Sequence, residues 1–196
     1  MLFAVLHSVL AMKKLKASLF NAFPFMHRWY RLLYNVISII LLALWVMLIP
    51  TENIDIYAFS TPWNFVFHAV QIASLLGLLK TVQSFDTSAF LGLKQISSSN
   101  PSSFHLDEVG IEPLITQGIY KYIRHPLYTF SMGVLLFHPY MTLRLMIMSI
   151  LIVAYFWIGS YFEEMRLLDK YGDQYKNYRI RTGRFIPSMK ALSSEK

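Results

Sequence analysis

The 196-residue sequence contains no cysteine, which excludes disulfide bonds, thiolate metal sites and a cysteine nucleophile. Charged residues are also scarce: they make up 15% of the chain, against about 25% in soluble domains. Apolar residues make up 55%, above the roughly 45 to 50% that is usual in soluble proteins. The composition therefore indicates a protein that lies in a lipid bilayer.

Several enzyme motifs are absent as well. The sequence has no glycine-rich phosphate loop and no Gly-x-Ser-x-Gly turn, so nothing supports a nucleotide triphosphatase or a serine hydrolase. Its six histidines include no closely spaced pair of metal ligands, so no metal site is predicted. The formal charge is +7, but the basic residues flank apolar segments and form no separate arm. We therefore expect contact with a membrane and not with nucleic acid.

Long apolar runs predict an all-α, polytopic membrane helix bundle of about five transmembrane helices. The runs cover residues 2–12, 32–49, 63–79, 127–137 and 143–162. Because a crossing helix needs about 20 residues, run 127–137 either extends back through Tyr120 or spans only part of the bilayer. Pro139 ends that run. The last two runs are therefore expected to form a C-terminal helical hairpin.

The basic residues predict an orientation. With the N-terminus outside and five crossings, every Lys and Arg except Arg144 falls on the cytosolic side. The outer loop 51–61 carries Glu52 and Asp55 instead. We therefore predict an external N-terminus, a cytosolic C-terminus and a basic, tyrosine-bearing segment, 172–184, at the inner membrane surface.

The segment 118–128 (Gly-Ile-Tyr-Lys-Tyr-Ile-Arg-His-Pro-Leu-Tyr) gathers polar side chains where a helix begins. Pro126 suits the first turn of that helix, and free N–H groups there favour an anion. Arg124 and His125 come directly before it, so a ligand that carries a carboxylate would fit. The alternative is an interfacial belt, where Tyr, Arg and His are common. The combination of these residues with Pro126 favours a site.

Glu163 and Glu164 form a second polar signal, at the expected end of run 143–162. Neighbouring residues on a helix point about 100° apart, so one carboxylate can face the bundle while the other meets water. We assign the inward position to Glu163 and interpret Glu164 as a solvated residue paired with nearby Lys and Arg. An acidic pair at a helix C-terminus opposes the helix dipole, which predicts a cation nearby.

Two separated motifs resemble a known family. The first is Gly-x-Tyr-x-x-x-Arg-His-Pro-x-Tyr; the second is Glu-Glu-x-x-Leu-x-x-x-Tyr-Gly-x-x-Tyr-x-x-Tyr with a closing Phe-Ile-Pro. In order and spacing they resemble the isoprenylcysteine carboxyl methyltransferase superfamily, which includes phospholipid methyltransferases. The matching residues are Gly118, Tyr120, Arg124, His125, Pro126, Tyr128, Glu163, Glu164, Leu167, Tyr171, Gly172, Tyr175, Tyr178, Phe185, Ile186 and Pro187. The N-terminal half is similar to the bacterial methanethiol S-methyltransferase and NnrU-like groups.

The resemblance implies S-adenosylmethionine as cofactor and methyl donor. By motif position, the cofactor contacts would be Leu114, Ile115, Tyr120, His125, Pro126, Leu127, Tyr128 and Glu163. The catalytic residues would be Arg124, His125 and Glu163. Tyrosine rings and a carboxylate suit the donor's sulfonium, while Arg124, His125 and the helix start suit its carboxylate. Methyl transfer needs a nucleophile held in line with the methyl group and no metal.

The resemblance also bears on the methyl acceptor. Four residues before the inward glutamate, the isoprenylcysteine enzymes carry a substrate-binding arginine, whereas this chain has Gly159. This difference favours a small or lipophilic acceptor, such as the thiol methanethiol, that partitions into the bilayer. Two other functions stay open: an NADPH-dependent membrane reductase related to sterol reductases, and a noncatalytic, NnrU-like membrane accessory protein.

We expect one integral membrane domain, residues 1–196, in a bacterial inner membrane. Its predicted parts are the N-terminal helices (1–85), a cytosolic loop that begins the cofactor site (86–126), the helical hairpin (127–162) and a cytosolic C-terminal segment (163–196). The cofactor pocket would lie on the cytosolic side.

Overall fold

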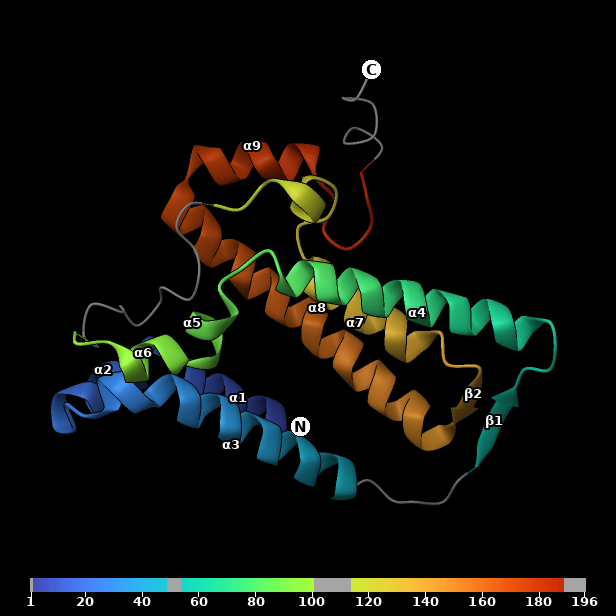
Figure 1. Ribbon diagram of the computed structural model, residues 1–196, viewed down its shortest axis with the longest axis horizontal. Helices are drawn as coiled ribbons and strands as arrows, with labels where there is room; N and C mark the ends of the chain where they lie inside the picture. The colour runs from blue at the N-terminus through green and yellow to red at the C-terminus, as the bar shows by residue number, and fades with distance from the viewer. Residues whose placement is uncertain (1, 49–53, 101–113, 189–196) are drawn as a thin grey trace. The chain divides into compact units, whose positions relative to one another are not determined.

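The computed structural model describes residues 2–48, 54–100 and 114–188 (Figure 1). The chain divides into two compact units, which are treated separately below. The first consists of Met1–Pro50 and Phe85–Glu112, and the second of Thr51–Ser84 and Pro113–Lys196. The residues around the Arg-His-Pro and Glu-Glu motifs all belong to the second unit.

All elements described in the first unit are helices. Its elements are α1 (Leu2–Ala11), α2 (Lys13–Ala22), α3 (Met26–Leu48), α5 (Thr87–Leu91) and α6 (Leu93–Ser97). His7 of α1 lies between two side chains of α3: the Tyr34 hydroxyl is 2.8 Å from Nε2, and the Ser38 hydroxyl is 2.9 Å from Nδ1. Hydrogen bonds of this kind hold apolar helices together where water is excluded.

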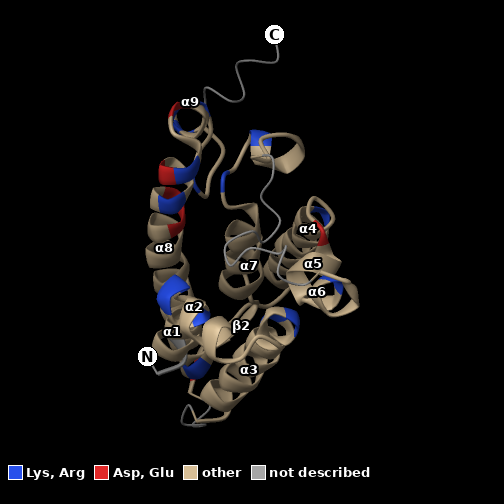
Figure 2. Cartoon of the chain, turned by 90° about the vertical axis from the view of Figure 1, so that its left-hand side faces the viewer, with Lys and Arg blue, Asp and Glu red and all other residues tan. Residues whose placement is uncertain are grey.

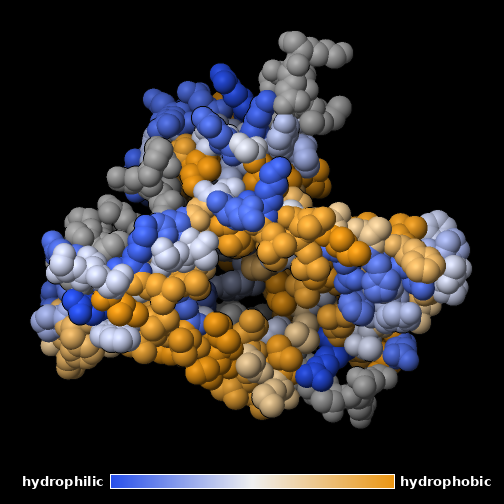
Figure 3. Space-filling view, in the orientation of Figure 1, coloured by the Kyte–Doolittle hydropathy of each residue, from blue (hydrophilic) through white to orange (hydrophobic). Residues whose placement is uncertain are grey.

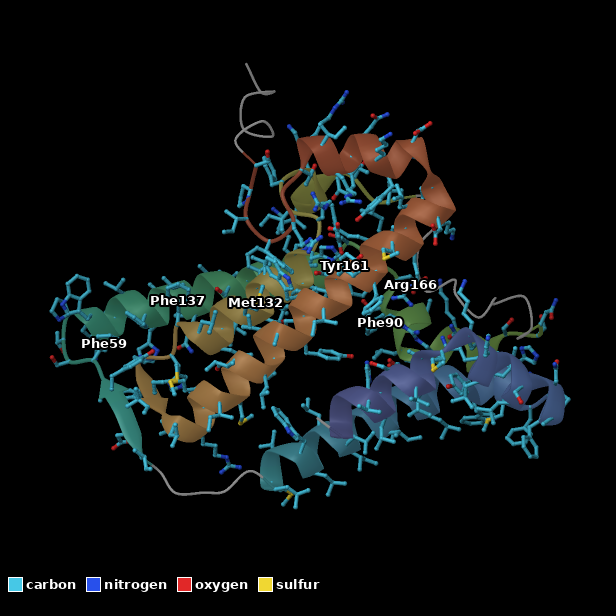
Figure 4. The ribbon with its side chains drawn as sticks, turned by 180° about the vertical axis from the view of Figure 1, so that it is seen from behind. Phe59, Phe90, Met132, Phe137, Tyr161 and Arg166 are labelled. Carbon is cyan, nitrogen blue, oxygen red and sulfur yellow. The ribbon has the colours of Figure 1, made fainter. Side chains whose placement is uncertain are left out.

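The second unit is built around a helical hairpin. Its elements are β1 (Asp55–Ala58), α4 (Trp63–Val82), the 3₁₀ helix η2 (Gly118–Lys121), α7 (Pro126–Leu136), β2 (Tyr140–Thr142), α8 (Leu143–Tyr171) and α9 (Asp173–Arg181). Strand β2 joins α7 to α8 and pairs antiparallel with β1. At this end the ring of Phe67 lies 4.6 Å from that of Phe59 and 5.9 Å from that of Phe137, measured between centroids. Figure 4 labels Phe59 and Phe137. The predicted C-terminal hairpin is thus present.

Three of the described helices, α3, α4 and α8, are long and apolar enough to cross a membrane. Few of their residues are buried inside the protein; apolar side chains cover much of the visible face of α4, and hydrophilic residues gather over α9 (Figure 3). Exposed apolar side chains along helices of this length are typical of a surface that faces lipid. The all-α membrane bundle is confirmed, whereas the number of five crossings stays a prediction.

The fourth apolar run, 127–137, was expected either to extend back through Tyr120 or to span only part of the bilayer. It forms a short helix. Helix α7 begins at Pro126 and has 11 residues, which at about 1.5 Å per residue is roughly half of the hydrocarbon thickness. It does not extend back through Tyr120, because residues 118–121 form the separate helix η2. Helix α7 by itself can therefore span only part of a bilayer.

Two sequence-based expectations need correction. Helix α8 does not end near Phe162 but continues to Tyr171, so Glu163 and Glu164 lie inside it and not at its C-terminus. The polar residues that follow are good helix formers, and the helix ends only at Gly172, whose φ of 52° favours glycine. Segment 86–126 is also more than a loop, since it contains α5, α6 and η2.

Helices α4 and α7 approach each other closely at two glycines. A Cβ atom on Gly77 of α4 would lie 2.5 Å from Cε1 of Phe130, and one on Gly133 of α7 would overlap the Ser74 hydroxyl. Small residues at such positions allow membrane helices to pack tightly. This packing fixes α7, and with it the Arg-His-Pro motif at its start.

We expect Gly77→Val to lower the free energy of unfolding by about 1 to 3 kcal/mol, the usual cost of overpacking a close interface. The measurement is the thermal unfolding midpoint of the detergent-purified protein. Gly159→Ala is the matched control, because a Cβ there meets no atom within 4 Å. If both variants unfolded at the wild-type temperature, the contact between α4 and α7 would not depend on Gly77.

Candidate functional site

The start of α7 is held by the segment that follows α9. The backbone N–H groups of Arg124 and His125 donate to the carbonyl oxygens of Gly183, at 2.8 Å, and Arg184, at 3.1 Å. The Thr129 hydroxyl donates to the carbonyl oxygen of Phe185 at 2.9 Å. A Cβ at position 183 would overlap the backbone of Ile186, so this turn requires glycine. Residues 182–185 are therefore part of the site.

Glu164 lies at the centre of the site, with only 2% of its side chain exposed. Its Oε1 accepts a hydrogen bond from Arg124 Nε at 2.9 Å, and its Oε2 accepts one from Arg184 Nη2 at 3.1 Å. Arg179 Nε lies 3.5 Å from Oε2. The interpretation of Glu164 as a solvated residue is wrong. The cations that it was expected to find are present, but they surround it in the interior because the chain folds back over α8 after Gly172.

His125 lies between the two glutamates. Its Nε2 is 3.1 Å from Glu164 Oε1, and its Nδ1 is 3.5 Å from Glu163 Oε2. Burial by itself lowers the pKa of His125, but hydrogen bonds and the charges of Glu163 and Glu164 outweigh burial, so the pKa is raised. An imidazolium, which donates from both nitrogens, satisfies both carboxylates.

This arrangement predicts a pH dependence of stability. Because the folded protein holds the His125 proton more tightly than the unfolded chain, the stabilisation is complete below the unfolded pKa of about 6.5. It is lost as the pH rises through the raised pKa of His125. We expect the thermal unfolding midpoint in detergent to fall across this window in wild type and to fall less in His125→Gln. Parallel curves for the two proteins would exclude His125 as the titrating group.

Glu163 is the more accessible of the two carboxylates, with 33% of its side chain exposed. The Tyr128 hydroxyl donates to its Oε2 at 3.0 Å. The ring of Tyr128 stacks between His125, at 5.4 Å, and Phe156, at 4.7 Å, nearly parallel to both. Among the described residues, the contacts of Glu163 with Tyr128 and His125 both use Oε2, which leaves Oε1 to accept from a ligand. Glu163 thus presents a negative charge beside aromatic rings.

The structure brings most of the predicted site residues together. His125, Tyr128 and Glu163 are in direct contact, and Pro126 is buried at the first turn of α7. Burial and then the charge of Glu163 raise the pKa of Tyr120, which places that tyrosine within the electrostatic reach of Glu163. The remaining predicted cofactor contacts are half-buried apolar residues: Leu114, Ile115 and Leu127.

Arg124 was expected to bind the carboxylate of the cofactor, but its guanidinium has other partners. Besides Glu164, its guanidinium donates to the carbonyl oxygens of Arg179, at 3.1 Å, and Thr182. Its side chain is 9% exposed, so little of it remains for a ligand. We therefore interpret Arg124 as a residue that positions Glu164 and the C-terminal segment.

Sequence reasoning missed the contribution of α9 and the residues after it. Tyr175 was expected at the membrane surface but is 1% exposed, and its hydroxyl has no hydrogen-bond partner among the described residues. The Tyr178 hydroxyl donates to the Tyr120 carbonyl at 2.6 Å. Basic and acidic residues both lie along this end of α8 and on α9 (Figure 2). The expectation of nearby cations came from a helix end placed at Glu163 and Glu164; α8 continues to Tyr171, so that argument does not apply, and it did not identify Arg179 or Arg184.

Comparison with known proteins supports a methyltransferase. The model of the phospholipid methyltransferase family matches residues 65–174. The chain is 27% identical over 194 residues to the methanethiol S-methyltransferase of Pseudomonas deceptionensis, covering 96% of this chain and 70% of that protein. It is 28% identical to methanethiol S-methyltransferase 1 of Bradyrhizobium diazoefficiens, covering 95% and 64%. It is also 28% identical to the methanethiol S-methyltransferase of Crocosphaera subtropica, covering 95% and 71%.

No solved structure matches the chain. The chain spans about two thirds of the length of the relatives it matches, and 64% in the case of Bradyrhizobium diazoefficiens. The family match covers more than half of the chain and includes both the Arg-His-Pro and Glu-Glu motifs. Together with the three apolar helices, the match identifies an integral membrane protein that belongs to the phospholipid methyltransferase family.

Proposed function

We propose that this membrane methyltransferase uses S-adenosylmethionine and methylates a small thiol such as methanethiol. The observation that carries the proposal is the Glu163 carboxylate, which is 33% exposed and lies beside the stacked rings of Tyr128 and Phe156. A carboxylate next to aromatic faces favours a cation in partly dry surroundings. The donor has two positive groups, a sulfonium and an ammonium.

The residues present fit both the positive groups and the carboxylate of such a cofactor. Glu163 and the ring of Tyr128 would hold a positive group, while the first turn of α7 offers backbone N–H groups to a carboxylate. Arg124 contributes indirectly, because its donors are used by Glu164 and by backbone carbonyls. When bound, the cofactor supplies an activated methyl group. The protein's own residues bind it, orient it and limit the access of water.

The proposed acceptor follows from the relatives and from the surroundings of Glu163. The relatives that cover the chain are named methanethiol S-methyltransferases. A carboxylate at the site repels an acceptor that carries a carboxylate of its own, whereas aromatic rings attract sulfur. A small, uncharged thiol meets both conditions.

The decisive experiment is isothermal titration of the detergent-purified protein with S-adenosylhomocysteine and, separately, with NADPH. We expect binding of the first only, and we expect mass spectrometry to find S-adenosylmethionine or its demethylated product co-purified. Membranes that contain the protein should transfer a labelled methyl group from S-adenosylmethionine to methanethiol. Binding of NADPH alone would favour a reductase, and cofactor binding without transfer to any thiol, amine or carboxylate would refute the proposed acceptor.

We also propose that the N-terminus lies outside and the C-terminus in the cytosol of a bacterial cell. Every basic residue except Arg144 then falls on the inner side. Because the chain has no cysteine, Ser194→Cys provides a single thiol for labelling. We expect a membrane-impermeant maleimide to label it only after cells are broken. A Ser60→Cys variant in the predicted outer loop is the positive control, because it should be labelled in intact cells. Labelling of Ser194→Cys in intact cells would contradict the proposed orientation.

A further inference from the structure

Helix η2 is a single turn, and the N–H groups that follow it bind elsewhere. The N–H of Ile123 donates to the Ile119 carbonyl at 3.2 Å, and the N–H of Arg124 donates to the segment after α9 at 2.8 Å. A short 3₁₀ helix has few hydrogen bonds of its own, and their geometry is poor. The last carbonyl oxygens of η2, those of Tyr120 and Lys121, are therefore left for donors from other elements.

Two hydroxyl groups at the end of α9 supply these donors. The Tyr178 hydroxyl donates to the Tyr120 carbonyl at 2.6 Å, and the Thr182 hydroxyl donates to the Lys121 carbonyl at 3.3 Å. Thr182 is the residue at which α9 ends, and residues four apart lie on the same side of a helix. Tyr178 is half-buried and Thr182 is buried, so water has little access to these bonds. One side of α9 thus caps η2.

Tyr120 connects this contact to the candidate site. Its side chain is half-buried, and burial and then the charge of Glu163 raise its pKa, so the ring lies within the electrostatic reach of that carboxylate. An aromatic ring near a carboxylate favours a cation. Because Tyr120 is part of η2, the backbone of η2 determines where this ring lies. A group that fixes that backbone therefore bears on the binding of a cationic ligand.

We propose that Tyr178 is a positioning residue for the methyl donor: its hydroxyl fixes η2 and so holds the ring of Tyr120 near Glu163. Thr182 acts in the same way through the next carbonyl group. The inference rests on the proposed function and adds residues of the C-terminal segment that do not themselves touch the cofactor. Without these bonds η2 loosens, and the cofactor has to order it on binding, which lowers the affinity.

Tyr178→Phe tests the contact without any cofactor, because it removes the hydroxyl and keeps the ring. Hydrogen–deuterium exchange of the detergent-purified protein should become about three- to tenfold faster in the peptide that spans 118–123, as expected for the loss of one hydrogen bond. Thr182→Val should give a smaller increase, because its bond is longer. The matched control is Tyr161→Phe, which changes an exposed tyrosine of α8 and should exchange like wild type.

A titration with S-adenosylmethionine shows whether the effect passes through Tyr120. Tyr178→Phe should weaken binding about three- to tenfold. In a Tyr120→Leu background the same substitution should change the affinity by less than about twofold, because the ring that it positions is gone. Equal losses in both backgrounds would show that Tyr178 supports the fold in general, and would overturn the positioning role.

The two measurements separate this role from the proposed function. Failure of wild type to bind S-adenosylmethionine would refute the proposed function. Binding by wild type, together with unchanged exchange or unchanged affinity in Tyr178→Phe, would refute only the role of Tyr178.

Discussion

Glu164→Gln is expected to lower the free energy of unfolding by about 3 to 5 kcal/mol, the usual loss when one partner of a buried ion pair is removed. The variant keeps the shape of the side chain but removes the charge that Arg124 and His125 share in the interior. Its amide group also places a donor against the donors of Arg184. The measurement is the thermal or denaturant unfolding of the detergent-purified protein.

The control is Asp169→Asn, because Asp169 is an exposed acidic residue on the same helix and its loss should cost little. The double variant Glu164→Gln/Arg184→Gln should unfold less readily than the sum of the two single effects predicts, because it removes a cation together with the anion. If Glu164→Gln unfolded like Asp169→Asn, the buried cluster would not hold α7, α8 and the C-terminal segment together.

Glu163→Gln is expected to act on binding and not on folding. Charge-assisted hydrogen bonds contribute roughly 1.5 to 3 kcal/mol, so the affinity for S-adenosylmethionine should fall about tenfold or more. The unfolding midpoint should change much less than in Glu164→Gln, because the side chain is partly exposed and the amide oxygen can still accept from Tyr128. Isothermal titration of folded protein measures the first effect, and thermal unfolding measures the second.

Comparing two ligands makes this test sharper. S-adenosylmethionine carries a sulfonium and an ammonium, whereas S-adenosylhomocysteine keeps only the ammonium. A larger loss for the first ligand would place Glu163 near the sulfonium, and equal losses would place it near the ammonium. Wild-type affinity of Glu163→Gln for both ligands would refute a role for Glu163 in the cofactor site.

The two glutamates show the limit of sequence reasoning at this site. The sequence predicts that adjacent carboxylates on a helix point in different directions, and that an acidic pair needs a cation nearby. It assigns the interior to Glu163 and water to Glu164, whereas Glu164 is the buried one. The direction of each side chain depends on Arg179 and Arg184, which approach only after the chain turns at Gly172. The sequence pattern around the two glutamates does not predict that turn.

The sequence by itself determined where the long apolar helices lie and which residues at the start of α7 contribute to the site. Apolar runs predicted α3, α4, α7 and α8, because long apolar helices are stable in lipid. Pro126 and Pro139 indicated the limits of α7. Only the tertiary structure decided which charges meet. Arg124 and Arg184 are 60 positions apart in the chain and share one carboxylate, and such contacts arise from the packing of whole elements, which neither periodicity nor spacing along the chain records.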